Sequence, residues 1–124
     1  MSEPSAESSL PTVTDAEMET VLQYAQPYSI VILRTGPQHD SPDATSLLRE
    51  HNRRNLALRA AGELAVVLRI DDDSDVTGVN IFDRDVPTTT TLVNDDPAVQ
   101  AGVLAVEIHP GHGFPGDSLP PEPD

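Results

Sequence analysis

The chain has no cysteine and no tryptophan. It also has no lysine, and all seven of its basic residues are arginine. The absence of cysteine excludes disulfides, thiolate nucleophiles and cysteine-ligated metals. The absence of lysine excludes Schiff-base chemistry from an amine side chain. Aromatic residues make up only 3% of the chain, so it lacks a broad platform for stacking nucleobases.

The formal net charge is −14, and part of the excess lies at the two ends of the chain. Residues 1–26 hold five acidic side chains and no arginine, and residues 111–124 hold three acidic side chains and no arginine. A phosphate backbone or an anionic lipid surface repels such a protein, so we expect neither nucleic acid nor a membrane as partner. Residues 1–10 lack the basic and apolar regions of a signal peptide, which predicts a cytoplasmic protein.

The first quarter of the chain predicts a disordered segment, a short helix and a strand. Residues 1–13 are rich in Ser, Glu and Pro, a composition typical of disorder. Thr14 and Glu17 match a capping box, and apolar residues then recur at helical spacing within residues 14–27. Residues 28–34 are rich in β-branched side chains, which favours a strand.

Further elements follow from hydrophobic periodicity and turn residues. They are a helix at 44–61, strands at 64–70 and 77–82, a helix at 86–94, a strand at 103–109, and a Pro/Gly-rich tail at 111–124. Gly62 stands where a helix commonly ends in a left-handed residue. Thr88 to Thr91 are poor helix formers, since β-branched side chains lose rotamer freedom in a helix.

The predicted order is a β-α-β-β-α-β unit preceded by an extra helix, which is a ferredoxin-like arrangement of the α+β class. It implies a four-stranded antiparallel sheet with helices on one face, formed by residues 28–110. The other face is apolar enough to need a cover, and a second sheet packed face to face would supply one. We therefore expect a homodimer.

His51 is the first candidate for chemistry. Leu47, His51 and Leu58 share one stripe of the predicted helix, so the imidazole lies on or beside the face that packs on the sheet. Histidine ordinarily titrates near neutral pH and can act as a general acid or base. Asp96 is the candidate carboxylate that would orient it, and Asp95 is the adjacent alternative. Each of these residues also has a structural reading, as a packed histidine or a turn-forming cap.

Neither a metal nor a cofactor is expected. Asp71, Asp73 and Asp75 alternate as in a calcium loop, but Val76 and Phe82 replace the Gly and Glu that such a loop needs. The four histidines lack the spacing of a ligand set. The glycines are isolated, so the chain has no Gly-rich phosphate loop.

Six short pieces of the chain resemble, in order and spacing, the YciI-like (YCII-related) family. They are Arg34-Thr35-Gly36-Pro37, Glu50-His51, Ala61-Gly62-Glu63-Leu64, Gly78-Val79-Asn80-Ile81-Phe82, Asp96-Pro97-Ala98-Val99-Gln100-Ala101-Gly102 and Val106-Glu107-Ile108-His109-Pro110. The resemblance covers residues 28–115. It implies a dimeric α+β barrel whose suspected site pairs a histidine with an aspartate, matched here by His51 and Asp96. Relatives with this barrel include cofactor-free isomerases and lyases acting on ring compounds.

The favoured function is thus a cofactor-independent enzyme that moves a proton on a small, cyclic or carbonyl-containing substrate. His51 and Asp96 would be catalytic, Asn80 would donate a hydrogen bond to a developing oxyanion, and Arg34 would bind a substrate carboxylate. The alternatives are a non-catalytic dimeric module that binds or senses a small ligand, and an interaction protein that uses its acidic tails.

Overall fold

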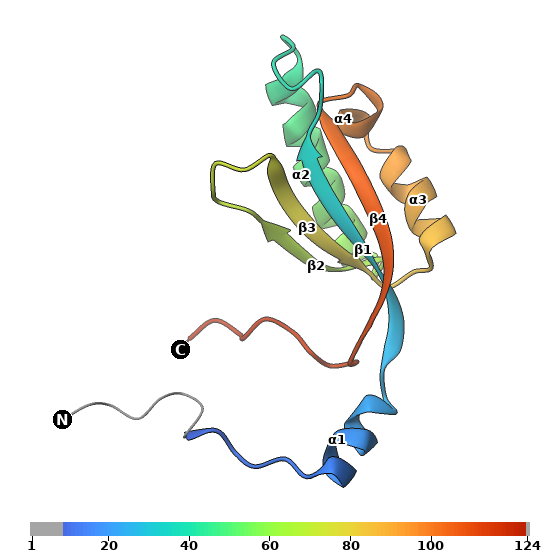
Figure 1. The fold of residues 1–124 in the computed structure, drawn as a ribbon. Helices are drawn as coiled ribbons and strands as arrows, with labels where there is room; N and C mark the ends of the chain where they lie inside the picture. Colours follow the sequence, from blue (N-terminus) through green and yellow to red (C-terminus); the bar gives the residue numbers. More distant parts are fainter. Residues whose placement is uncertain (1–8, 124) are drawn as a thin grey trace, which may run out of the picture.

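The computed structural model describes residues 9–123, which form four helices and four strands (Figure 1). In chain order they are α1 (Asp15–Leu22), β1 (Gln26–Thr35), α2 (Ala44–Ala60), β2 (Leu64–Arg69), β3 (Val76–Phe82), α3 (Val86–Asn94), α4 (Pro97–Gln100) and β4 (Leu104–Gly113). Of the segment 1–13 that the sequence predicts to be disordered, residues 1–8 fall outside the described residues. Across residues 9–123, every helix is too short or too polar to cross a bilayer.

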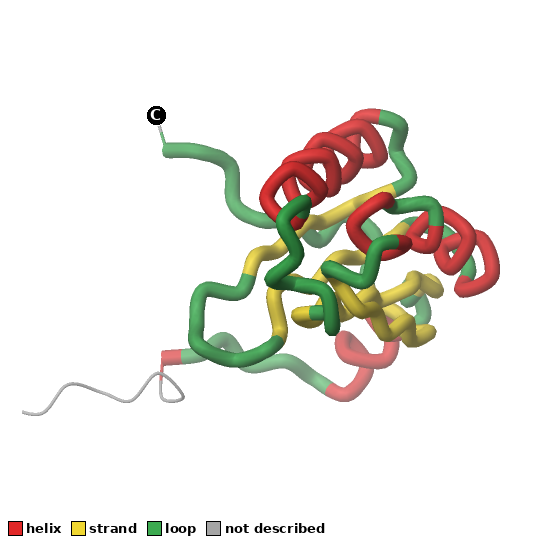
Figure 2. The backbone as a smooth tube through the Cα atoms, turned by 90° about the horizontal axis from the view of Figure 1, so that it is seen from above, coloured by secondary structure: helices red, strands yellow, loops and turns green. Residues whose placement is uncertain are grey.

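The four strands form one antiparallel sheet in the order β2-β3-β1-β4. Helices α2, α3 and α4 lie on one side of it, and α1 lies beyond the end of the sheet (Figures 1 and 2). The other face carries no helix within the described part of the chain. The predicted α+β class is confirmed, and the strand order is compatible with a ferredoxin-like fold.

Alternation along the two central strands separates the two faces of the sheet. In β1, Ser29, Val31 and Leu33 are buried, and the residues between them are only half-buried. β3 alternates in the same way, with Asn80 opposite Val31 and Phe82 opposite Ser29. Successive strand residues point to opposite faces, so the buried set faces the helices. This face holds the core and also places one buried amide, that of Asn80, on the helix side of the sheet.

The two strands β1 and β4 are longer than predicted. β1 begins at Gln26, and β4 continues through Pro110 to Gly113. They pair as a two-stranded ribbon beyond the point where β3 leaves β1 at Ser29. Proline cannot donate to a ladder but is tolerated in an edge strand, and β4 is an edge. The irregular tail therefore begins only after Gly113, and α1 ends earlier than the sequence predicted.

Gly36 lies where the chain leaving β1 passes very close to the turn before β4. Its N–H donates to the carbonyl oxygen of Val103 at 2.9 Å. A Cβ built on Gly36 would lie 2.9 Å from the carbonyl carbons of Gly102 and Val103, and closer still to the Gly102 oxygen. These are backbone atoms, which cannot rotate out of the way. Only glycine fits this crossing without a shift of the main chain.

Candidate active site

The fold brings His51 and Asp96 into direct contact, although they are 45 residues apart in the chain. His51 is on the sheet-facing side of α2 and is 8% exposed, and Asp96 precedes α4 and is 4% exposed. The His51 Nδ1 and the Asp96 Oδ2 are 2.5 Å apart. A carboxylate accepting from Nδ1–H fixes the ring orientation and leaves Nε2 as the nitrogen with a lone pair.

Asp96 is held in place by its second oxygen. Its Oδ1 accepts from the backbone N–H of Ala98 at 2.9 Å, as the N-cap of α4, and Pro97 occupies the first helical position. Asp96 is thus both the cap of α4, through Oδ1, and the partner of His51, through Oδ2. The neighbouring Asp95 is exposed and serves as the C-cap of α3, so the carboxylate in contact with His51 is Asp96.

Asn55 is the site residue that the sequence interpretation missed. It lies one turn after His51 on α2, is 7% exposed, and places its Nδ2 3.2 Å from the His51 Nε2. With Nδ1–H directed at Asp96, Nε2 accepts from the Asn55 amide. The sequence held one signal for Asn55, its position four residues after His51 in the predicted helix. Residues i and i+4 of a helix are neighbours on one face.

A cleft of about 450 Å³ opens beside this pair, between α2 and the β2–β3 end of the sheet. Its polar wall includes His51, Asn55 and Asn80, and its apolar wall includes Leu33 and Val67. This volume falls within the range of roughly 300–1,000 Å³ that small-molecule sites occupy. A mostly apolar wall with a few convergent polar groups is the usual composition of such a site.

Asn80 reaches this cleft from β3. It is 3% exposed and lies opposite Val31 of β1 and Val67 of β2. Its Oδ1 is buried and has no hydrogen-bond partner among the described residues. Buried amides are normally satisfied, so this oxygen requires a partner that the described residues do not supply.

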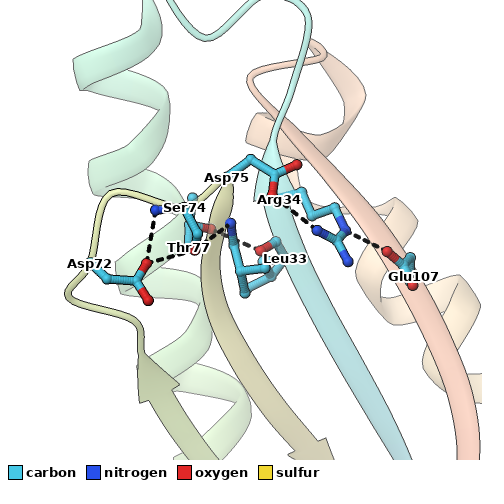
Figure 3. Close-up of polar contacts among 8 residues, drawn as sticks. Leu33, Arg34, Asp72, Ser74, Asp75, Thr77 and Glu107 are labelled. Atoms are coloured by element: carbon cyan, nitrogen blue, oxygen red, sulfur yellow. Dashed lines mark hydrogen bonds and ion pairs between the residues drawn. The ribbon is translucent and has the colours of Figure 1, made fainter.

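Arg34, the predicted partner of a substrate carboxylate, does not line this cleft. Figure 3 shows its guanidinium between Asp75 and Glu107, with Nη1 3.0 Å from an Asp75 oxygen and Nε paired with Glu107. Leu33 faces the helices, so its neighbour Arg34 projects from the opposite face of the sheet. The hydrogen bond from Arg34, followed by that from His109, holds the pKa of Glu107 below its usual value. The arginine is thus engaged in an ion-pair network away from His51.

Across residues 9–123, no three His, Asp or Glu side chains gather as a metal would require. In the acidic turn, one carboxylate oxygen of Asp72 accepts from both the N–H and the hydroxyl of Ser74, and the turn is exposed (Figure 3).

His39 lines the cleft, and its Nδ1 is 3.0 Å from the Gly36 carbonyl. His109 lies on the opposite face of the sheet beside Glu107. His39 and His51 thus line the same cleft, whereas His109 lies away from it.

Comparison with known proteins leaves the family of the chain open. No family model matches it, and no curated protein is significantly similar to it. The YciI-like assignment accordingly stays a proposal, which depends on the motifs of the sequence and the geometry of the site.

Proposed function

We propose that this chain is a YciI-like, cofactor-independent enzyme that transfers a proton on a small substrate, with the chemistry of an isomerase or lyase. The observation that carries the proposal is the buried contact between His51 and Asp96 at the wall of a cleft of about 450 Å³. A buried carboxylate that fixes the imidazole of a histidine beside a substrate-sized space is the usual construction of a general base.

In the proposed reaction, a substrate C–H bond next to a carbonyl group breaks and its proton moves to the His51 Nε2. The electron pair left behind moves onto the carbonyl oxygen. Asp96 stabilises the imidazolium that forms, and Asn80 donates a hydrogen bond to the developing oxyanion. The proton then returns to a different atom in an isomerisation, or a leaving group departs in an elimination. For the first step, the substrate must take the place of the Asn55 amide at Nε2.

The second candidate is a dimeric module that binds or senses a small ligand without converting it. One observation favours it: both ring nitrogens of His51 already have partners, Asp96 on Nδ1 and Asn55 on Nε2. A fully satisfied buried network can serve packing specificity alone. The two candidates share the cleft and differ in whether Nε2 becomes free when a ligand enters.

Hydrogen–deuterium exchange tests the enzymatic proposal without a known substrate. We expect the protein to catalyse deuterium incorporation next to the carbonyl of some members of a panel of small ketones and lactones in D₂O, followed by ¹H NMR. His51→Gln should lower that rate by about 100-fold or more, because it removes the base while keeping a polar side chain of similar size. His112→Gln, on an exposed residue of the β1–β4 ribbon, is the matched control.

An unchanged exchange rate in a folded His51→Gln protein would contradict the proposal. Ligand-induced thermal stabilisation that survives this substitution, with no exchange in either protein, would establish the binding module instead.

We also propose that the chain forms a homodimer through the helix-free face of the sheet, as in a dimeric α+β barrel. Ile32 and Val79 lie opposite each other at the middle of that face, Ile30 lies opposite Ile81, and Leu68 extends the apolar surface onto β2. Two sheets packed face to face bury such side chains about 10 Å apart. The charged residues on this face, Arg34 and Glu107, are already paired within the chain, which lowers their cost at an interface.

Sedimentation equilibrium tests the dimer. The wild-type protein should have twice the 13.3 kDa mass of one chain at micromolar concentration. Ile81→Glu should shift it to the monomer, because a charge would be buried in the apolar interface. Leu56→Glu, on a residue of α2 that is 59% exposed, should leave the mass unchanged. A monomeric wild-type protein would refute the proposed interface.

A further inference from the structure

A second, much smaller cavity lies behind the His51–Asp96 pair. It measures about 10 Å³, and its polar lining comes from His51, Arg54, Asn55, Asn80 and Asp96. A single water molecule needs a cavity of roughly 10–15 Å³ by this kind of measure. The cavity therefore has the size of one water and lies against the residues of the proposed site.

Two of the residues lining this cavity have buried atoms without a hydrogen-bond partner. These atoms are the Nε of Arg54 and the Oδ1 of Asn80, and no side chain or backbone group within residues 9–123 pairs with either. Nε–H of arginine can only donate, and an amide oxygen can only accept. A water molecule can accept from one and donate to the other at the same time.

The position of the guanidinium is fixed independently of this cavity. The Nη2 of Arg54 donates to the backbone carbonyl of Leu92 at 2.8 Å, which ties α2 to α3. Since the guanidinium is planar, that contact also restricts where Nε–H can point. The unpartnered donor is thus a consequence of how the arginine is anchored, and the cavity lies beside it.

We propose that one buried water bridges the Arg54 Nε and the Asn80 Oδ1, and that this bridge sets the orientation of the Asn80 amide. Asn80 lines both the small cavity and the large cleft. With its oxygen held by the water, its NH₂ group faces the cleft as a donor. Which end of an amide points where follows from its hydrogen-bond network, and here the water supplies the deciding partner.

This bridge gives Arg54 the role of a positioning residue that acts through the water and Asn80. It also specifies the chemistry of the ligand. An NH₂ donor in the cleft favours a ligand that places a carbonyl or other acceptor oxygen beside Asn80, and disfavours one that places a donor hydrogen there. That part of the inference depends on the proposed function, whereas the water and the amide orientation do not.

Neutron diffraction on deuterated crystals of the full chain tests both claims directly, because it distinguishes amide nitrogen from oxygen and locates the deuterons of water. We expect one D₂O between the Arg54 Nε and the Asn80 Oδ1, and the ND₂ group of Asn80 directed into the cleft. An empty cavity, or an ND₂ group turned toward Arg54, would overturn the inference. Neither result depends on turnover, so a failure here is separate from a failure of the exchange assay with His51→Gln.

A pair of variants then tests whether Arg54 holds the water. Arg54→Lys keeps the charge and a terminal donor for the Leu92 carbonyl but has no Nε, and Arg53→Lys changes the adjacent arginine, whose side chain is 70% exposed. In solution, the Nε–H resonance of Arg54 in the wild-type protein should show cross-relaxation with a long-lived water. The Asn80 NH₂ resonances should shift in Arg54→Lys and keep their positions in Arg53→Lys. Unshifted Asn80 resonances in Arg54→Lys would remove Arg54 from the role proposed for it.

Discussion

Asp96→Asn is expected to reduce proton transfer by about 10²–10⁴-fold while leaving the protein folded. The asparagine Oδ1 can still accept from the Ala98 N–H, so the cap of α4 survives. Its NH₂ group, however, would face the His51 Nδ1 and force that nitrogen to become the acceptor. The proton then resides on Nε2, which can no longer act as a base. Deuterium exchange measures the rate, and ¹⁵N shifts of the imidazole report which nitrogen is protonated.

Two further variants separate chemistry from stability at this position. Asp95→Asn changes the adjacent exposed carboxylate and should leave the rate and the tautomer unchanged. Asp96→Ala should lower the free energy of unfolding by about 2–4 kcal/mol, from the lost cap and the unpaired buried imidazole. If Asp96→Asn retained the Nδ1–H tautomer and a rate within about twofold of wild type, Asp96 would not be the orienting group.

Gly36→Ala is expected to destabilise the fold by about 3 kcal/mol or more, as an overpacked site that cannot relax. The new methyl group would overlap the backbone of Gly102 and Val103 and would break the hydrogen bond from the residue-36 N–H to the Val103 carbonyl. One of the two chain segments that cross here follows the central strand β1, and the other leads into the edge strand β4. Urea unfolding followed by circular dichroism gives the change.

The control for this substitution is Gly113→Ala, where a Cβ would meet only the Tyr28 ring at 3.8 Å, an ordinary contact. Removing the flexibility of a glycine from the unfolded chain is worth about 0.4–1 kcal/mol of stabilisation when the folded backbone tolerates it. Gly113→Ala should therefore be neutral or slightly stabilising. Equal effects of the two variants would show that the backbone at Gly36 moves apart easily.

Helix α3 shows where local propensity and structure disagree. Its four consecutive threonines are poor helix formers, yet the helix runs over Val86–Asn94 as predicted. The Asp85 side chain accepts from the Thr88 N–H at 2.9 Å, and the hydroxyl of Thr90 donates to the Val86 carbonyl at 2.7 Å. The cap and the proline in the first turn offset part of the lost rotamer freedom, and the bond of Thr90 satisfies its hydroxyl within the helix. The cap was readable in the sequence, whereas the hydroxyl bonds follow only from the folded helix.

The candidate site was predictable where periodicity decides which way a side chain points. His51 followed from the helical stripe, and Asn80 from its place in a strand. Arg34 was chosen for its charge and not for its face of the sheet, and alternation along β1 places it on the face opposite Leu33. Asn55 and Arg54 gave no motif of their own, and their roles depend on contacts with residues distant in the chain.

The two oxygens of Asp96 join the proposed chemistry to the local folding of a very short helix. One oxygen holds the Ala98 amide at the start of α4, and the other holds the His51 ring. A fluctuation that opens the first turn of α4 would also release the carboxylate, and His51 would lose its partner in the same event. The exchange rate of the Ala98 amide hydrogen with solvent therefore measures how often the contact between His51 and Asp96 opens.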